Sequence, residues 1–68
     1  MPYQVHYRDE ETGYEWVANF NTEQEALEQA AMGAHVYGGV SPQEVVDDNG
    51  MVVQDQQAII KEADKLPD

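Results

Sequence analysis

The first twenty residues alternate between apolar and polar side chains. Tyr3, Val5 and Tyr7 are separated by polar residues, and the same period of two returns after the acidic run DEETG. Successive side chains of a β-strand point to opposite faces, so this pattern is typical of strands with one buried face. We therefore predict a β-hairpin with strands at about 3–8 and 14–20 and an aromatic-rich face directed inward.

The pattern then changes to the helical period. Thr22 and Glu25 have the spacing of a capping box, in which the threonine hydroxyl accepts a backbone N–H and the glutamate reaches back. These residues predict a helix at about 22–35 that Gly38-Gly39 ends. Its apolar stripe, at i, i+3, i+4 and i+7, consists of Leu27, Ala30, Ala31 and Ala34. Its opposite side carries Glu25, Glu28, Gln29, Met32 and His35.

The segment from Ser41 to Gly50 fits two structures. Ser41-Pro42-Gln43-Glu44 has the residues of a helix start, with proline at the first helical position. Against this, Asn49-Gly50 lies between paired valines, and Asn-Gly favours a hairpin with a type I′ turn. We favour strands at about 44–47 and 51–54, and a short helix followed by a strand is the alternative.

A terminal helix at about 56–65 follows, with Asp55 as its N-cap and an apolar stripe at Ile59, Ala63 and Leu66. Together these elements predict one α+β domain over residues 1–68. Two hairpins form an antiparallel sheet, the first helix packs on one face, and the terminal helix lies on the other face or at an edge.

Charge adds the second main feature of the sequence. Fourteen acidic residues against three basic ones give a formal net charge of −11, and there is no cysteine. No Lys or Arg occurs between Arg8 and Lys61, an interval that holds eleven acids. This charge disfavours direct binding to nucleic acid or to an anionic membrane. No apolar run approaches the roughly 18 residues of a membrane span, so we expect a cytoplasmic protein.

The sequence contains no complete motif for metal binding or catalysis. With Gly50 at position 6 of a calcium loop, Val45 and Gln56 would occupy the end positions that must supply ligands. His6 and His35 have no spacing that suggests a zinc site. We therefore expect neither an enzyme nor a bound metal or cofactor. Among the aromatic residues, Trp16 shares the inward side of its strand and is expected in the core, whereas Tyr37 is a candidate contact residue.

The acids remain as candidate chemistry. They are either a solvated surface or an electrostatic surface that binds a protein with a basic surface, and we adopt the second interpretation. The predicted partner-binding residues are Asp9, Glu10, Glu11, Glu25, Glu28, Met32, Asp47 and Asp48. The alternative function is a homo-oligomer or accessory subunit that buries the valine hairpin or the stripe at Ile59, Ile60 and Leu66.

The run FNTEQEALEQAA, residues 20–31, follows a two-stranded opening and precedes a glycine-bearing connection into EVV. Over about 25 residues this arrangement resembles the small phage-encoded inhibitors of bacterial RNA polymerase from T7-like phages, and also uncharacterised bacterial strand-strand-helix-strand-strand domains. The resemblance implies a protein-binding inhibitor. The inhibitors use arginines on the strand after the helix, where this chain has Gln43 and Glu44, so no functional residue is carried over.

Overall fold

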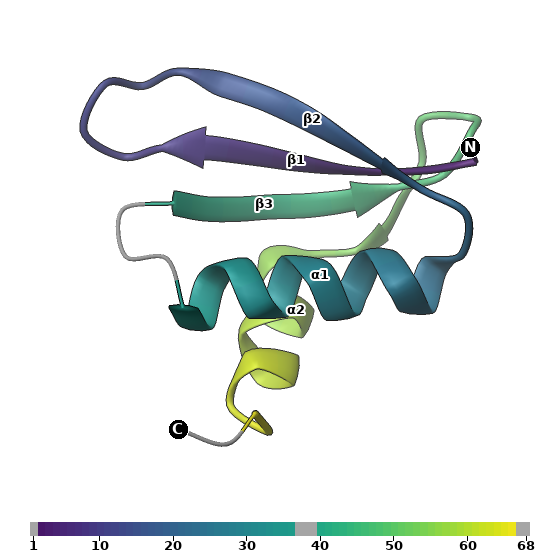
Figure 1. Cartoon of the computed structure of the whole chain (residues 1–68). Helices are drawn as coiled ribbons and strands as arrows, with labels where there is room; N and C mark the ends of the chain where they lie inside the picture. Colours follow the sequence, from purple (N-terminus) through teal and green to yellow (C-terminus); the bar gives the residue numbers. More distant parts are fainter. Residues whose placement is uncertain (1, 37–39, 67–68) are drawn as a thin grey trace.

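The computed structural model describes residues 2–36 and 40–66 and confirms the predicted α+β class. The sheet has the strand order β2-β1-β3-β4, with neighbouring strands antiparallel. Figure 1 shows the sheet above the two helices. In chain order the elements are β1 (Tyr3–Asp9), β2 (Glu15–Phe20), α1 (Glu23–Val36), β3 (Val40–Val46), β4 (Val52–Gln54) and α2 (Gln56–Ala63).

The first hairpin has the predicted faces. Tyr3 pairs with Phe20, Val5 with Ala18 and Tyr7 with Trp16, so the apolar residues of both strands share the side that faces the helices. In the turn, the Asp9 carboxylate accepts the backbone N–H groups of residues 11 and 12, at 2.9 and 3.3 Å. Gly13 completes the turn at φ 77°, a conformation that suits glycine.

Helix α1 begins as predicted, because the Thr22 hydroxyl accepts the N–H of Glu25 at 3.1 Å. Ala26, Ala30 and Ala31 are fully buried, so the buried stripe begins at Ala26, one residue before the start of the predicted stripe at Leu27. A Cβ at Gly33 would lie 3.4 Å from Cε1 of Tyr7. The small residues of α1 therefore let the helix approach the sheet closely. The predicted end at Gly38-Gly39 lies outside the described residues.

Residues 41–50, for which a hairpin and a short helix were both considered, form the second hairpin. Its first strand, β3, is longer than predicted and begins at Val40. Pro42 can lie within β3 because the register with β1 shifts beside it and because β4 pairs only with Val45 and Val46. Beside Pro42, where β4 does not pair with β3, the Gln56 side chain of α2 donates to the Ser41 hydroxyl at 3.1 Å and to the Pro42 carbonyl at 3.4 Å.

The predicted type I′ turn is wrong. Among the described residues only Gly13 and Gly50 have positive φ, so Asn49 does not adopt the conformation that a type I′ turn requires. The Gly50 N–H donates to the Asp47 carbonyl at 3.0 Å, and Gly50 itself has φ 80°. A hairpin loop of this kind combines a type I turn with a following left-handed glycine.

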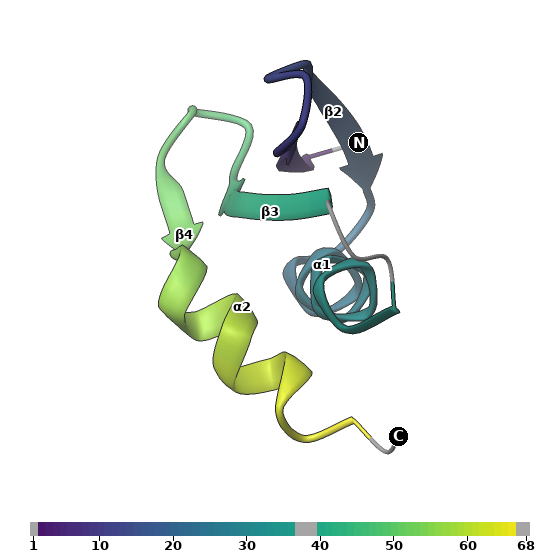
Figure 2. The same cartoon turned by 90° about the vertical axis from the view of Figure 1, so that its left-hand side faces the viewer.

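Helix α2 lies on the same side of the sheet as α1, beside α1 and below the β3–β4 end (Figure 2). Of the two positions predicted for the terminal helix, the one on the opposite face of the sheet is therefore wrong. Ile59 is fully buried and joins Val5, Ala26, Ala30 and Val45 in the core cluster. Because alanines leave space beside α1, the isoleucine can reach this core from a second helix on the same side.

Candidate functional site: an open sheet face between two acidic turns

The sheet face opposite the helices is covered by neither α1 nor α2. The side chains on this open sheet face come from alternate residues of the strands, since Val17 and Glu44 both pair with the central His6. The Gln4 amide donates to the Asn19 side chain at 3.1 Å in the neighbouring row. The open sheet face comprises Gln4, His6, Arg8, Glu15, Val17, Asn19 and Glu44, together with Val46, which pairs with Gln4 and is only 5% exposed.

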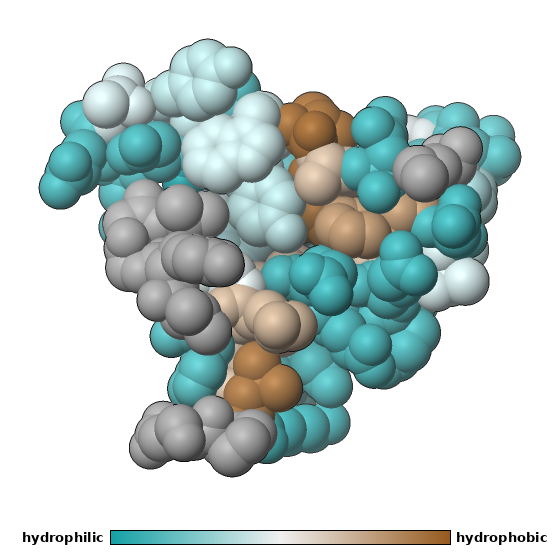
Figure 3. Space-filling model, in the orientation of Figure 1, coloured by the Kyte–Doolittle hydropathy of each residue, from teal (hydrophilic) through white to brown (hydrophobic). Residues whose placement is uncertain are grey.

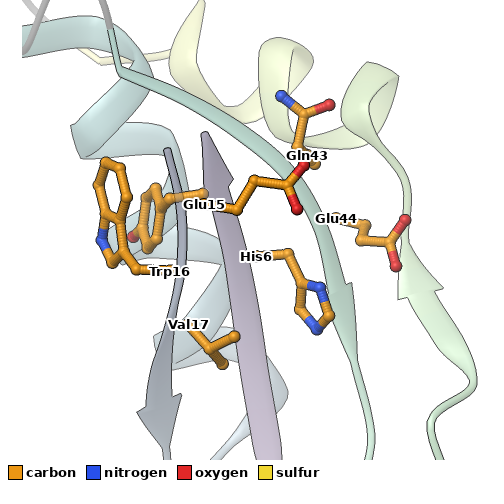
Figure 4. Close-up of a pocket in the computed structure, with 7 residues that line it drawn as sticks. His6, Glu15, Trp16, Val17, Gln43 and Glu44 are labelled. Atoms are coloured by element: carbon orange, nitrogen blue, oxygen red, sulfur yellow. The ribbon is translucent and has the colours of Figure 1, made fainter. Parts of the chain in front are cut away.

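A shallow hollow of about 510 Å³ is lined mainly by residues of the open sheet face, with Tyr7 and Trp16 of the helix side also contributing to it. In Figure 4 the Glu15 side chain extends over β1 toward β3, and His6 and Glu44 project beside it. The Gln43 amide is fixed nearby, because it donates to the Ser41 carbonyl and hydroxyl at 3.2 and 3.0 Å. The lining residues are His6, Tyr7, Glu15, Trp16, Val17, Gln43 and Glu44. The hollow thus combines two carboxylates with an imidazole and an apolar methyl surface.

Two acidic turns lie at opposite ends of this face. The first follows β1 at Asp9, and the second follows β3, whose last residue Val46 pairs with Gln4 at the start of β1. The five steps from Gln4 to Asp9 separate the two ends by about 17 Å at 3.3 Å per residue. Asp47 and Asp48 line a second hollow together with Gln4 at their end. Both turns therefore add negative charge at the margins of the open sheet face.

The aspartates of these turns differ in what their carboxylates do. Asp47 Oδ1 accepts the N–H of Asn49 and the N–H of Met51, both at 2.9 Å, just as Asp9 accepts two backbone groups in the other turn. These two carboxylates fix turn geometry. Glu10, Glu11 and Asp48 are exposed and extend their charge toward solvent.

Three predicted partner-binding residues lie on the other side of the molecule. Glu25, Glu28 and Met32 are exposed on α1, away from the alanines that pack on the sheet, and Met32 is 45% exposed. Gln24 donates to the Glu28 carboxylate at 3.0 Å. The structure therefore brings five of the eight predicted residues to the two ends of the sheet and separates the other three from them. Tyr37, the other predicted contact, lies outside the described residues.

Reasoning from the sequence did not select the residues in the middle of the open sheet face. Glu15, Val17 and Glu44 were not among the predicted partner-binding residues. The alternation within 14–20 does place Glu15 and Val17 on the outward side of their strand. The missing information was that this side stays uncovered, which depends on where α2 packs.

A row of stacked aromatic rings lies on the helix side of the first hairpin. The Trp16 ring stacks on Tyr7 at 5.5 Å between centroids and on Tyr14 at 5.9 Å. Trp16 is half-buried and lies outside the core cluster, so its predicted core position is only partly correct. Tyr14 is 67% exposed, whereas burial raises the pKa of the Tyr7 hydroxyl above its ordinary value of 10.0. The stack therefore leads from the core to the surface.

Within residues 2–36 and 40–66, no group of three or more His, Asp or Glu side chains is arranged to hold a metal ion. No helix in the same ranges has the length and apolar character needed to cross a membrane. On the face in Figure 3, hydrophobic residues occur in separate groups between hydrophilic ones.

The fold and this face define a small α+β protein with an uncovered, acid-flanked sheet. Comparison of the chain with known protein families, curated proteins and solved structures finds no significant match. The resemblance to phage-encoded polymerase inhibitors therefore stays a prediction.

Proposed function

We propose that this protein is a non-enzymatic acidic module that binds a basic surface of another protein through its open sheet face. The observation that carries the proposal is the charge on this face and its two turns, where seven acids accompany Arg8 as the one basic residue among those named. The acids are Asp9, Glu10, Glu11, Glu15, Glu44, Asp47 and Asp48.

Electrostatic attraction to a basic surface follows from this arrangement. The screening length is about 8 Å at physiological ionic strength and about 30 Å at 0.01 M, so charges spread over about 17 Å act mainly on basic groups close to each of them at physiological salt and act together at low salt. Such complementarity raises the association rate and fixes orientation, and it weakens as salt is added. Val17, 46% exposed in the middle of the face, supplies an apolar contact that salt does not screen.

The partner class follows from the same charge. A basic surface on a cytoplasmic protein commonly serves to hold nucleic acid, since Lys and Arg neutralise phosphates. A module that occupies this surface excludes nucleic acid from it. We therefore extend the proposal to inhibition or regulation of a nucleic-acid-binding protein, while this chain itself does not bind nucleic acid.

Two double variants test which face binds. Glu15→Gln/Glu44→Gln removes two charges from the open sheet face, and Glu25→Gln/Glu28→Gln removes two from the exposed side of α1. Binding to a fluorescent decalysine peptide is measured by anisotropy at low salt. We expect the first variant to lose about fivefold in affinity and the second less than twofold, because 1.4 kcal/mol corresponds to a tenfold change and exposed pairs contribute less.

Equal losses in both variants would show that only net charge matters and would overturn the assignment to the open sheet face. Absence of peptide binding by the unmodified protein at about 0.05 M salt, where screening is weak, would overturn the function itself.

A further inference from the structure

Strand β2 is an edge strand with outward-directed backbone groups. In the described part of the chain it pairs with β1 alone. The Asp9 N–H donates to the Tyr14 carbonyl at 2.8 Å, and antiparallel pairs alternate between bonded and non-bonded positions. With the observed register, the N–H and C=O groups of Trp16, Ala18 and Phe20 point to β1. Those of Glu15, Val17 and Asn19 therefore point away from the sheet.

This edge lacks the features that usually prevent strands from pairing with another chain. Proteins protect edges with lysine, proline, bulges or very short strands. Strand β2 has six residues without lysine or proline, and its register with β1 is uninterrupted. The opposite edge, β4, has three residues and a register shift beside it. In Figures 1 and 2 no other labelled element lies beyond β2.

We propose that two copies of this chain associate through antiparallel pairing of their β2 strands. The axis of the dimer passes beside Val17, so that Val17 faces Val17 of the second copy. Glu15 then lies opposite Asn19 of the second copy, and three pairs each exchange two backbone hydrogen bonds. The two four-stranded sheets become one, with all helices on one side and both open faces on the other.

Electrostatics and length favour Val17 among the axes that pass beside a residue with outward-directed backbone groups, and the cysteine variants below distinguish this register from axes beside Trp16 or Ala18. An axis at Glu15 would place two carboxylates opposite each other, which destabilises a cross-strand pair, and it would pair the strand with the turn of the second copy. An axis at Asn19 would leave only the last residues of β2 paired. With the axis at Val17, nearly the whole strand pairs, and Trp16 and Tyr14 lie opposite Ala18 and Phe20 of the second copy on the helix side.

A second copy is a suitable occupant because β2 is locally almost neutral. Glu15 is its single charged residue in a chain of net charge −11, so direct repulsion between two paired β2 strands is small. Association also enlarges the buried surface of a chain whose size permits only about 60% burial on folding. The remaining repulsion between the copies weakens as salt is added. This dependence is opposite to that of binding to a basic partner.

Sedimentation equilibrium of the full chain at about 0.05 and 0.5 M NaCl tests the proposal, because screening lengths differ severalfold between them. We expect a monomer–dimer equilibrium that is at least severalfold tighter at high salt. Val17→Lys places a like charge at the axis and should give a monomer. Val52→Lys is the matched control on the other edge, where Val52 is 51% exposed and Val17 is 46% exposed, and it should remain dimeric.

Single cysteines test the register independently of these variants, since the chain has no cysteine. A bonded antiparallel pair has Cα atoms about 5.5 Å apart, within the range of a disulfide. Val17→Cys should therefore form a disulfide-linked dimer on mild oxidation, whereas Asn19→Cys should not. A monomer in the unmodified protein at high salt, dimers in both lysine variants, or equal cross-linking of the two cysteines would each overturn the proposal. Peptide binding by the open sheet face is tested separately with the glutamine variants, which leave Val17 unchanged.

Discussion

Asp9 and Asp47 have the same position in the two hairpins of this protein. Each is the acid at the start of a turn, and each carboxylate accepts two backbone N–H groups. A hydrogen bond to a charged acceptor contributes more than a neutral one, at about 1.5–3 kcal/mol. The carboxylates of Asp9 and Asp47 therefore stabilise the two turns, whereas the neighbouring Asp48 is exposed.

The variants Asp47→Ala and Asp48→Ala separate these roles. We expect Asp47→Ala to lower the free energy of unfolding by about 1–3 kcal/mol, because two backbone donors lose their acceptor. Asp48→Ala should change it by less than about 0.5 kcal/mol, as is usual at exposed positions. Urea denaturation followed by circular dichroism measures both values. Asp47→Asn keeps one side-chain oxygen and should lie between them, and equal effects of the two alanine variants would refute the structural role of Asp47.

At the scale of elements, the position of α2 decides which surfaces are free. Ile59 and Ile60 are adjacent in the sequence, yet Ile59 is fully buried and Ile60 is 50% exposed. Asp55 directs the start of the helix, because its carboxylate accepts the N–H of Ala58 at 2.9 Å. This N-cap and the contact of Ile59 with the core hold α2 beside α1, which leaves the other sheet face open.

Substitution of the two isoleucines by alanine tests this position. Ile59→Ala should destabilise the protein by about 2–5 kcal/mol, because it removes a buried side chain and leaves a cavity. Ile60→Ala should cost less than about 1 kcal/mol. Thermal or urea denaturation gives both numbers. A larger cost for Ile60 would mean that α2 presents another face to the core.

At the scale of the whole molecule, charge acts across a thin body. The shortest principal extent is 17 Å, about two screening lengths at physiological salt. Acids on the open sheet face and on α1 therefore repel each other weakly at physiological salt, and more strongly at low salt, where the screening length exceeds the thickness of the molecule. The ion pair between Lys65 and Glu62, at 3.6 Å, is local to the C-terminal end and offsets little of this repulsion.

Salt should consequently stabilise the monomer. Raising NaCl from about 0.02 to 0.3 M should increase the free energy of unfolding by about 1 kcal/mol, because the self-repulsion is screened. The corresponding rise in the melting temperature is about 4–8 °C for a domain of this size. Melting is followed at concentrations where sedimentation shows monomer. Glu10→Gln/Glu11→Gln should reduce the rise, and a melting temperature that is constant or falls with salt would contradict the argument.

The local order of this protein is readable in its sequence. Alternation predicts the first hairpin, Thr22 and Asp55 predict the two helix starts, and the paired valines around Asp47 to Gly50 predict the second hairpin. Each of these signals acts between neighbouring residues, through side-chain direction or capping hydrogen bonds. The type I′ turn was wrong for a local reason that the Asn-Gly pair does not reveal: the Asp47 carboxylate stabilises a different turn.

The sequence by itself determined the strand and helix segments, the inward parity of Tyr7 and Trp16, and the excess of acidic residues. The tertiary structure alone decided that Ile59 packs beside the alanines of α1, and hence that both helices share one side. It also decided that β2 is an edge strand and that Glu15, Val17 and Glu44 meet on an open face. The physical reason is that these outcomes depend on how whole elements share a small core, which no pattern within one element records.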